Sequence, residues 1–311
     1  MNEGPLMNEL SIMIRRCTLL LMLLLVVSAC EQPFAGDAEL ANEVAGETSV
    51  VLRFVHYEQD AFGMVSTTTD GAASRAETDI AMLCSRLNIA IFGSDGNKAK
   101  TVSQKADDDN FGTVALTLTE GTYSLVAVAH NCDGSATISD VAKVTFPNNK
   151  VTDTFYYYGQ LEVSGEQQTL DITLRRAVAM FRLVMTDAEV PAAVARFKFY
   201  YVGGSSTFSP QAGYGIVQSK QTEYRTYSAG GVYDIYTMPH TEDDVLTKLT
   251  VSALDAADNV LYERVFEDIP ITRNQVTRYT GLFFGGGATA SGSELHLRAN
   301  PDWDEYNDYN Y

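Results

Sequence analysis

The stretch Thr113-Val114-Ala115-Leu116-Thr117-Leu118-Thr119 alternates apolar and polar residues over most of its length. Because successive side chains of a β-strand point to opposite faces, this period of two predicts a strand with one buried face. The same alternation returns at 170–174 and at 249–253. Clusters of turn-forming residues, such as those at 94–97 and 147–149, lie between such runs. Helical periodicity is weak, so the sequence predicts an all-β protein built from β-sandwiches.

The composition restricts the class of partner. The chain has 311 residues, with 22 Lys and Arg against 40 Asp and Glu, and a formal net charge of −18. Phosphate backbones attract basic surfaces, so this balance argues against nucleic acid as a partner. A length near 300 residues is enough for two domains of ordinary size, each with its own core.

Three pairs of segments match one another in the two halves of the chain and keep the same order. They predict two similar sandwiches in tandem, with a boundary near 159–165. The matched pairs are 86–93 with 196–203, 121–130 with 231–240, and 149–152 with 274–277. His130 and His240 end the second pair, which favours a structural role for each histidine over metal binding.

The N-terminus carries an export signal. Arg15-Arg16 precedes a run of Leu and Val that is too short to span a bilayer, and the run ends in Val27-Ser28-Ala29-Cys30. This ending resembles the lipobox of bacterial lipoproteins, in which the signal is cut before the cysteine and the thiol is acylated. An ordinary signal or a twin-arginine signal is the alternative. We therefore expect lipidation at Cys30, followed by an acidic tether that is either a surface-export signal or a plain linker.

Cys84 and Cys132 remain after Cys17 is removed and Cys30 is acylated. A single pair of cysteines in an exported protein is a candidate disulfide, and two buried free thiols are the alternative.

Motifs for catalysis are missing from the sequence. It contains no His-Glu-x-x-His, Gly-x-Ser-x-Gly, Gly-x-x-x-x-Gly-Lys or Cys-x-x-Cys, so we expect no enzyme and no cofactor or metal. The Asp107–Gly112 segment only superficially matches a calcium loop, because Phe111 and Leu118 stand where ligands are needed. Tyr156-Tyr157-Tyr158 is expected to be half core and half surface rather than a platform for sugars.

Several stretches together resemble the fimbrillin superfamily. They are Cys30 with its lipobox, Val50–Phe54, Leu170–Met185, and above all Ile269-Pro270-Ile271-Thr272-Arg273-Asn274-Gln275-Val276-Thr277-Arg278-Tyr279-Thr280-Gly281. Within that superfamily the chain is most similar to the lipoprotein fimbrial anchor (minor subunit) proteins of type V pili. The resemblance implies two transthyretin-like β-sandwiches, no catalysis, and a non-catalytic fimbrial subunit that is joined to other fimbrial subunits by β-strand complementation.

These observations divide the chain into five parts. We expect a lipoprotein signal peptide at 1–29, an acidic tether at 30–48, an N-terminal sandwich at 49–162, a C-terminal sandwich at 163–287, and a C-terminal strand with an acidic tail at 288–311. The expected protein is an outer-membrane lipoprotein at the cell surface, most simply the lipid-anchored base of a fimbria. A surface lipoprotein that binds a glycan or another host ligand through the loops 203–206 and 209–215, or a tip adhesin, is the alternative.

Two further sites bear on assembly. The loop 66–78 contains Arg75, and shaft subunits of the resembled superfamily are cut after an arginine in such a loop; a base subunit would stay uncut. Leu295 and Leu297 alternate after a flexible spacer and are the candidate donor strand, the alternative being that they complete the chain's own second sandwich.

Overall fold

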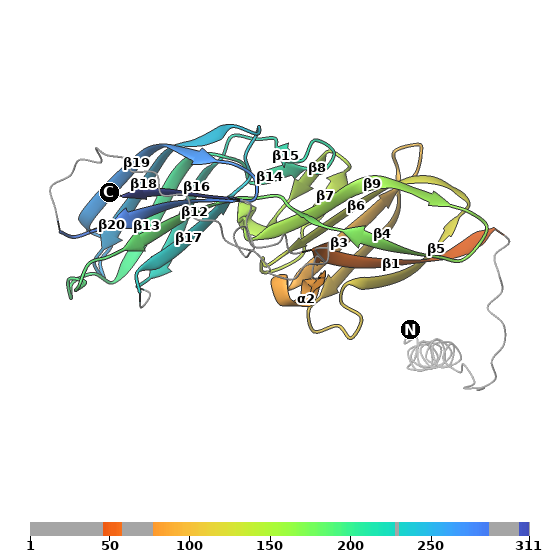
Figure 1. The fold of residues 1–311 in the computed structure, drawn as a ribbon, viewed down its shortest axis with the longest axis horizontal. Helices are drawn as coiled ribbons and strands as arrows, with labels where there is room; N and C mark the ends of the chain where they lie inside the picture. The colour runs from red at the N-terminus through yellow and green to blue at the C-terminus, as the bar shows by residue number, and fades with distance from the viewer. Residues whose placement is uncertain (1–45, 58–76, 228–229, 286–304, 311) are drawn as a thin grey trace, which may run out of the picture. The chain divides into compact units, whose positions relative to one another are not determined.

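The protein is nearly all β in the computed structural model, which describes residues 46–57, 77–227, 230–285 and 305–310 (Figure 1). The short helix α2 (Ile80–Leu83) and a 3₁₀ turn (Pro147–Asn149) interrupt the strands. The all-β fold class is therefore confirmed. In the described part of the chain, no helix is long and apolar enough to cross a membrane.

Two sheets contain strands from the first half of the chain. One joins β1 (Glu47–Tyr57), β2 (Glu77–Asp79), β5 (Thr113–Thr119) and β10 (Gln168–Thr173). The other runs in the order β11 (Arg175–Arg176), β9 (Thr154–Val163), β6 (Gly121–His130), β3 (Arg86–Phe92) and β4 (Lys98–Lys105).

Two more sheets contain strands from the second half. One has the order β17 (Val232–Thr237), β12 (Ala179–Met185), β20 (Gln275–Gly281), β21 (Glu305–Asn310). The other has the order β16 (Lys220–Thr226), β13 (Arg196–Gly203), β18 (Asp244–Leu254), β19 (Val260–Ile271). A small sheet combines strands of both halves: β15 (Tyr214–Gly215), β14 (Thr207–Ser209), β8 (Lys143–Thr145), β7 (Thr137–Asp140).

The alternating stretches form strands as predicted. Val114 and Leu118 of β5 are buried while Ala115 and Thr117 are exposed. The stretch 170–174 falls in β10 and the residue after it, and 249–253 falls in β18. The predicted turn at 94–97 is also present: Gly96 has a φ of 77°, and the backbone N–H of Asn97 donates to Asp95 Oδ1 at 2.9 Å.

The same strand order occurs twice along the chain. β1, β3, β4, β5, β6, β9 and β10 correspond in order and in pairing to β12, β13, β16, β17, β18, β19 and β20. In each set the first strand pairs in parallel with the last and antiparallel with the fourth. The repetition inferred from the sequence is thus present in the topology.

Two of the three sequence matches behind that inference were wrong. The pair 86–93 and 196–203 covers the equivalent strands β3 and β13. The pair 121–130 and 231–240 aligns β6 with β17, although β6 corresponds to β18. The third pair aligns 149–152, which precede β9, with the first residues of β20 and the residue before it. Strands of similar residue pattern look alike in sequence whichever sheet they enter, because pairing partners and not local pattern decide their place.

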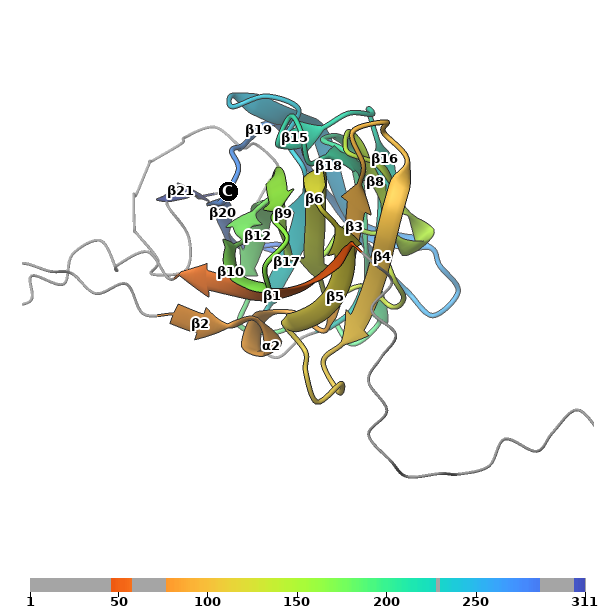
Figure 2. The same cartoon turned by 90° about the vertical axis from the view of Figure 1, so that its right-hand side faces the viewer.

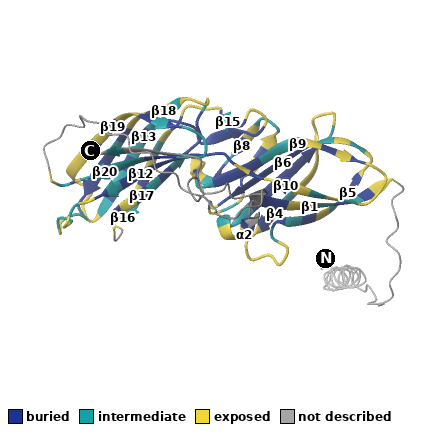
Figure 3. Cartoon of the chain, in the orientation of Figure 1, coloured by how far each residue is buried: buried dark blue, intermediate teal, exposed yellow. Residues whose placement is uncertain are grey.

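Buried side chains form three clusters, and buried segments run along the strands in Figure 3. One cluster lies between the β1 and β3 sheets and includes Leu52, Ile89 and Phe155. A second lies between the β12 and β13 sheets and includes Phe181 and Phe199. A third joins residues on the other face of the β3 sheet, in the small sheet and in the second half of the chain. Its members include Val128, Val144, Phe208, Met238 and Val276. The predicted division at 162 and 163 stays a prediction, although β10 lies beyond it and pairs with β1.

Candidate functional site

β1 lies in the interior of its sheet (Figure 2). Residues 50–55 pair in parallel with 168–173 of β10. On the other side of β1, residues 47–53 pair antiparallel with β5 and residues 55–57 with β2. A strand with partners on both sides satisfies its backbone N–H and C=O groups within the sheet. Loss of β1 would leave a groove between β10 and β5 with unpaired backbone groups on both walls.

The inner face of β1 is part of the core. Val50 and Leu52 are 0% exposed and Phe54 is 3% exposed, and all three belong to the cluster that contains Ile89 and Ile172. The alternation of apolar residues at 50, 52 and 54 explains why this segment enters the sheet with this face inward. The groove therefore binds its strand through main-chain hydrogen bonds and through pockets for alternate side chains.

An ion pair joins β1 to β10 on the outer face. Arg53 Nε and Nη2 donate to the two carboxylate oxygens of Asp171 at 2.6 and 2.7 Å, and the two residues are also Cα partners in the register. The hydrogen bonds from Arg53 lower the pKa of the Asp171 carboxyl below its ordinary value. Both side chains are about half exposed, so the pair contributes more to register than to stability.

The C-terminal strand β21 adds to the outer edge of β20. Residues 275–280 of β20 pair in parallel with 305–310, and the rings of Tyr279 and Tyr309 stack with centroids 4.6 Å apart. Burial, with a smaller contribution from Tyr309, raises the pKa of Tyr279 to about 12. Within the described residues, the equivalent edge of β10 has no such strand.

Four of the predicted site residues lie outside the described residues: Cys30, Arg75, Leu295 and Leu297. They stay predictions. The end of the expected acidic tail, by contrast, is β21, a strand that the sequence analysis did not place there. The sequence Glu305-Tyr306-Asn307-Asp308-Tyr309-Asn310 has no alternation of apolar and polar residues, so the apolar pattern gave no signal.

The candidate disulfide is not formed in the structure, where Cys84 and Cys132 are free and buried. Cys84 packs in the cluster between the β1 and β3 sheets, whereas Cys132 packs in the cluster on the other side of the β3 sheet. Burial raises the pKa of both thiols above the ordinary value. The two thiols thus belong to different clusters, and whether they pair in the exported protein stays a prediction.

The two histidines do not occupy equivalent positions. His130 ends β6 and is fully buried: its Nδ1 accepts from the backbone N–H of Cys132 at 3.1 Å, so Nε2 carries the proton and donates to Asn88 Oδ1 at 2.9 Å. Burial, and to a lesser degree the charge of Arg86, lowers the pKa of His130 to about 4. His240 lies in the turn after β17, with Nδ1 2.8 Å from Asp244 Oδ2. Their contacts are structural, and the described residues contain no group of three His, Cys, Asp or Glu that could hold a metal.

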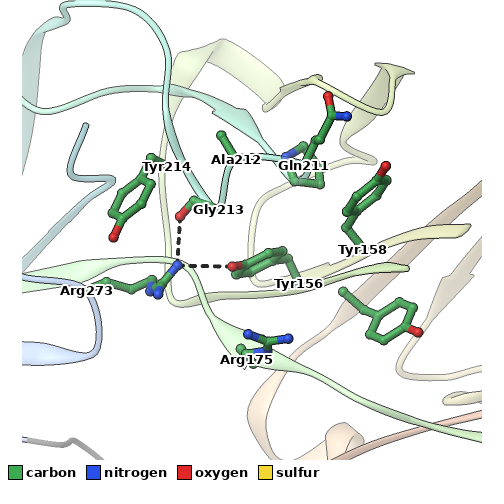
Figure 4. Close-up of a pocket in the computed structure, with 10 residues that line it drawn as sticks. Tyr156, Tyr158, Arg175, Gln211, Ala212, Gly213, Tyr214 and Arg273 are labelled. Atoms are coloured by element: carbon green, nitrogen blue, oxygen red, sulfur yellow. Dashed lines mark hydrogen bonds between the residues drawn. The ribbon is translucent and has the colours of Figure 1, made fainter. Parts of the chain in front are cut away.

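A polar hollow of about 250 Å³ lies beside β9 (Figure 4). Arg273 crosses it: Nη1 donates to the hydroxyl of Tyr156 at 3.1 Å and to the carbonyl of Gly213 at 3.0 Å, and the guanidinium lies 5.1 Å from the centroid of the Tyr214 ring. Gly213 has a φ of 77°, and a Cβ there would come within 2.7 Å of the Tyr156 hydroxyl. The sequence analysis named the loop 209–215 but missed Arg273, which is distant in sequence and joins the hollow only through the fold.

Comparison with known proteins gives the family. The sequence model of the fimbrillin-A associated anchor proteins Mfa1 and Mfa2 matches residues 51–308. No curated protein sequence matches the chain.

Several solved structures are similar to this chain at low sequence identity. A protein of Bacteroides thetaiotaomicron VPI-5482 is 13% identical, with 70% of this chain and 79% of that chain covered and a TM-score of 0.48. A fimbrial assembly protein from Parabacteroides distasonis ATCC 8503 is 12% identical, with 76% and 90% covered and a TM-score of 0.38. The fimbrial anchor protein Mfa2 from Porphyromonas gingivalis is 12% identical, with 70% and 82% covered and a TM-score of 0.38. Because the family match extends over most of the sequence, the chain belongs to the fimbrillin-A associated anchor proteins.

Proposed function

We propose that the protein is the lipid-anchored base subunit of a cell-surface fimbria. Its membership of the anchor family supports a place in a fimbria together with other fimbrial subunits. The proposal adds that Cys30 carries the lipid in the outer membrane and that the neighbouring subunit is joined by β-strand complementation.

The observation that carries the proposal is the position of β1, which completes both a sheet and a core. In sequence, β1 lies between Cys30 and Arg75. A cut after Arg75 would therefore remove the lipid and the strand together and open the groove between β10 and β5. A chain that keeps its lipid also keeps β1, so its own groove stays filled and the fimbria cannot extend by strand insertion at that groove.

The proposal assigns β21 as the segment available to a neighbouring subunit. It is a short C-terminal strand that follows a segment rich in Gly, Ser and Ala, and it adds at the edge of a sheet. A strand at an edge can leave with fewer lost contacts than a central strand, because only one side of its backbone is paired.

Membrane fractionation of cells that express Cys30→Ala tests the lipid anchor. The wild type should fractionate with the outer membrane and incorporate labelled palmitate, and the variant should be released. Unchanged fractionation of the variant without acyl label would contradict the anchor.

A deletion of residues 288–311 tests β21. Donation predicts that fimbrial subunits are no longer recovered with the protein in a pull-down while its thermal stability changes little. Loss of stability with intact association would show instead that the segment serves its own sheet.

A further inference from the structure

We propose that the hollow beside β9 binds a glycan residue that carries a carboxylate. The inference does not depend on the proposed base-subunit function. It uses residues from β9, β11, the loop between β14 and β15, and the turn between β19 and β20.

Two positively charged side chains line the hollow. Arg175 is exposed and lines the hollow; its backbone pairs with Tyr156 of β9, and its side chain makes no ion pair or hydrogen bond within the described part of the chain. Among the described residues, Arg273 donates to two neutral oxygens, those of the Tyr156 hydroxyl and the Gly213 carbonyl, and to no carboxylate. In a protein of net charge −18, other arginines such as Arg53, Arg182 and Arg196 are paired with carboxylates. Two guanidinium groups without a carboxylate partner on one hollow therefore offer a place for a carboxylate from outside, which a guanidinium can bind through two parallel hydrogen bonds.

The walls of the hollow combine aromatic rings with polar groups. Tyrosine rings line the hollow on more than one side, and Figure 4 shows Tyr158 beside Gln211 and Tyr214 on the opposite side of Gly213. Aromatic faces offer flat apolar contact, while the phenol hydroxyls and the amide of Gln211 offer donors and acceptors. Pro210 and Ala212 are the aliphatic side chains among the lining residues. A lining of this kind suits a ring that carries many hydroxyl groups better than an apolar ligand or an extended peptide.

The hollow is large enough for a sugar, and Arg273 is held in place at its wall. A second hollow of about 220 Å³ shares Tyr214 and Arg273 with the first. Each hollow alone is smaller than an ordinary small-molecule site, about 300–1,000 Å³, but the two together fall within that range and would accept more than one sugar ring. The carboxylate of Glu242 lines the second hollow and would repel a carboxylate of the ligand there. We therefore place the ligand carboxylate in the first hollow, beside Arg175 and Arg273. Gly213 allows the loop to approach Tyr156 and Arg273 closely, which fixes Arg273 before a ligand arrives.

Calorimetric titration of the mature protein tests the inference. The probes are trigalacturonate and 3′-sialyllactose, which distinguish a uronic from a sialic acid, and their neutral counterparts galactotriose and lactose. At least one acidic probe should bind about tenfold or more tightly than its neutral counterpart.

Three variants identify the groups responsible. Arg175→Gln should weaken binding of the acidic probe about tenfold and reduce its advantage over the neutral probe. Tyr158→Ala should weaken both probes and leave their ratio unchanged. Lys100→Gln removes the same charge from an exposed position on β4 and should have no effect. Because the side chain of Arg175 has no polar partner within the described residues and Gln keeps the backbone pairing with Tyr156, the replacement should leave the fold intact, which thermal unfolding would check.

Several results would overturn the inference. Neutral and acidic glycans binding equally well would remove the role of the arginines, as would wild-type affinity in Arg175→Gln. Binding of triglutamate as tightly as the acidic glycans would show that the hollow takes carboxylates without preference for a sugar. Absence of binding by both acidic probes at millimolar concentration would exclude the assigned ligand class.

Discussion

Truncation of Leu52 in β1 tests whether this strand is an integral part of the folded protein. Leu52 is 0% exposed, and its Cα partners are Leu170 on β10 and Val114 on β5. Leu52→Ala removes buried methyl groups and leaves a cavity that a strand held on both sides cannot collapse to fill. Such changes cost about 2–5 kcal/mol, and we expect the upper half of that range.

The assay is urea unfolding followed by circular dichroism, with thermal unfolding beside it. At about 2–4 °C per kcal/mol for a chain of this size, the expected fall in Tm is roughly 7–20 °C. Val51→Ala is the matched control, because Val51 lies on the same strand with its side chain on the half-exposed face. It should cost less than about 1 kcal/mol.

A peptide with the sequence of Glu47–Tyr57 provides a second readout of the same strand. If β1 fills its own groove, the labelled peptide should not bind the folded protein. Equal stability of Leu52→Ala and Val51→Ala, together with stoichiometric binding of the peptide, would refute the reasoning, since it would mean that the groove is open.

The remaining predictions concern single groups. The pKa of His130 is lowered from 6.5 to about 4 in the folded protein. As the pH falls, the imidazole is therefore protonated in the unfolded state before it is protonated in the folded state. The contribution of His130 to stability is complete above pH 6.5 and is lost as the pH falls towards 4. The loss should reach about 3 kcal/mol, and His130→Gln should remove that part of the pH dependence of urea unfolding; an unchanged dependence would assign the slope to carboxylates. The side chain of Arg176 is 4% exposed and binds the carboxylate of Asp153 through two hydrogen bonds. Arg176→Ala leaves that carboxylate unpaired and should lower the free energy of unfolding by about 3–5 kcal/mol, whereas Arg53→Ala at an exposed pair should lower it by less than about 1 kcal/mol. Equal losses would contradict this prediction. Removal of β21 should lower the pKa of Tyr279 from about 12 towards its ordinary value, measured by phenolate absorbance; an unchanged pKa would mean that β21 does not cover this ring.

The strands could be predicted because their signal is local. Alternation at 113–119 is enough to place Val114 and Leu118 inward, whatever the strand pairs with. The repetition of the topology was inferred correctly, yet two of its supporting matches aligned segments that do not occupy equivalent positions. Which strands become neighbours depends on hydrogen bonds between segments as distant as β1 and β10, and a single sequence carries little record of that register.

The surroundings of the cysteines and the lining of the hollow beside β9 could not be predicted either, because they also depend on how distant segments meet. The burial of Cys84 and Cys132 suits an apolar thiol, but their place in two different clusters follows from the path of the chain between them. The loop 209–215 could be recognised from its turn residues, whereas Arg175 and Arg273 reach the same hollow from β11 and from the turn before β20. Side chains that converge from distant segments leave no spacing motif.

The N-terminus of the protein in purified fimbriae tests the central proposal most directly. Surface fimbriae would be isolated, and the protein in them would be analysed by N-terminal sequencing and intact-mass spectrometry. The base-subunit account predicts a chain that begins at an acylated Cys30 and retains the sequence through Arg75 with β1 attached. A chain that begins at Ala76 would contradict it, because such a protein would have lost both its lipid and the strand that fills its groove.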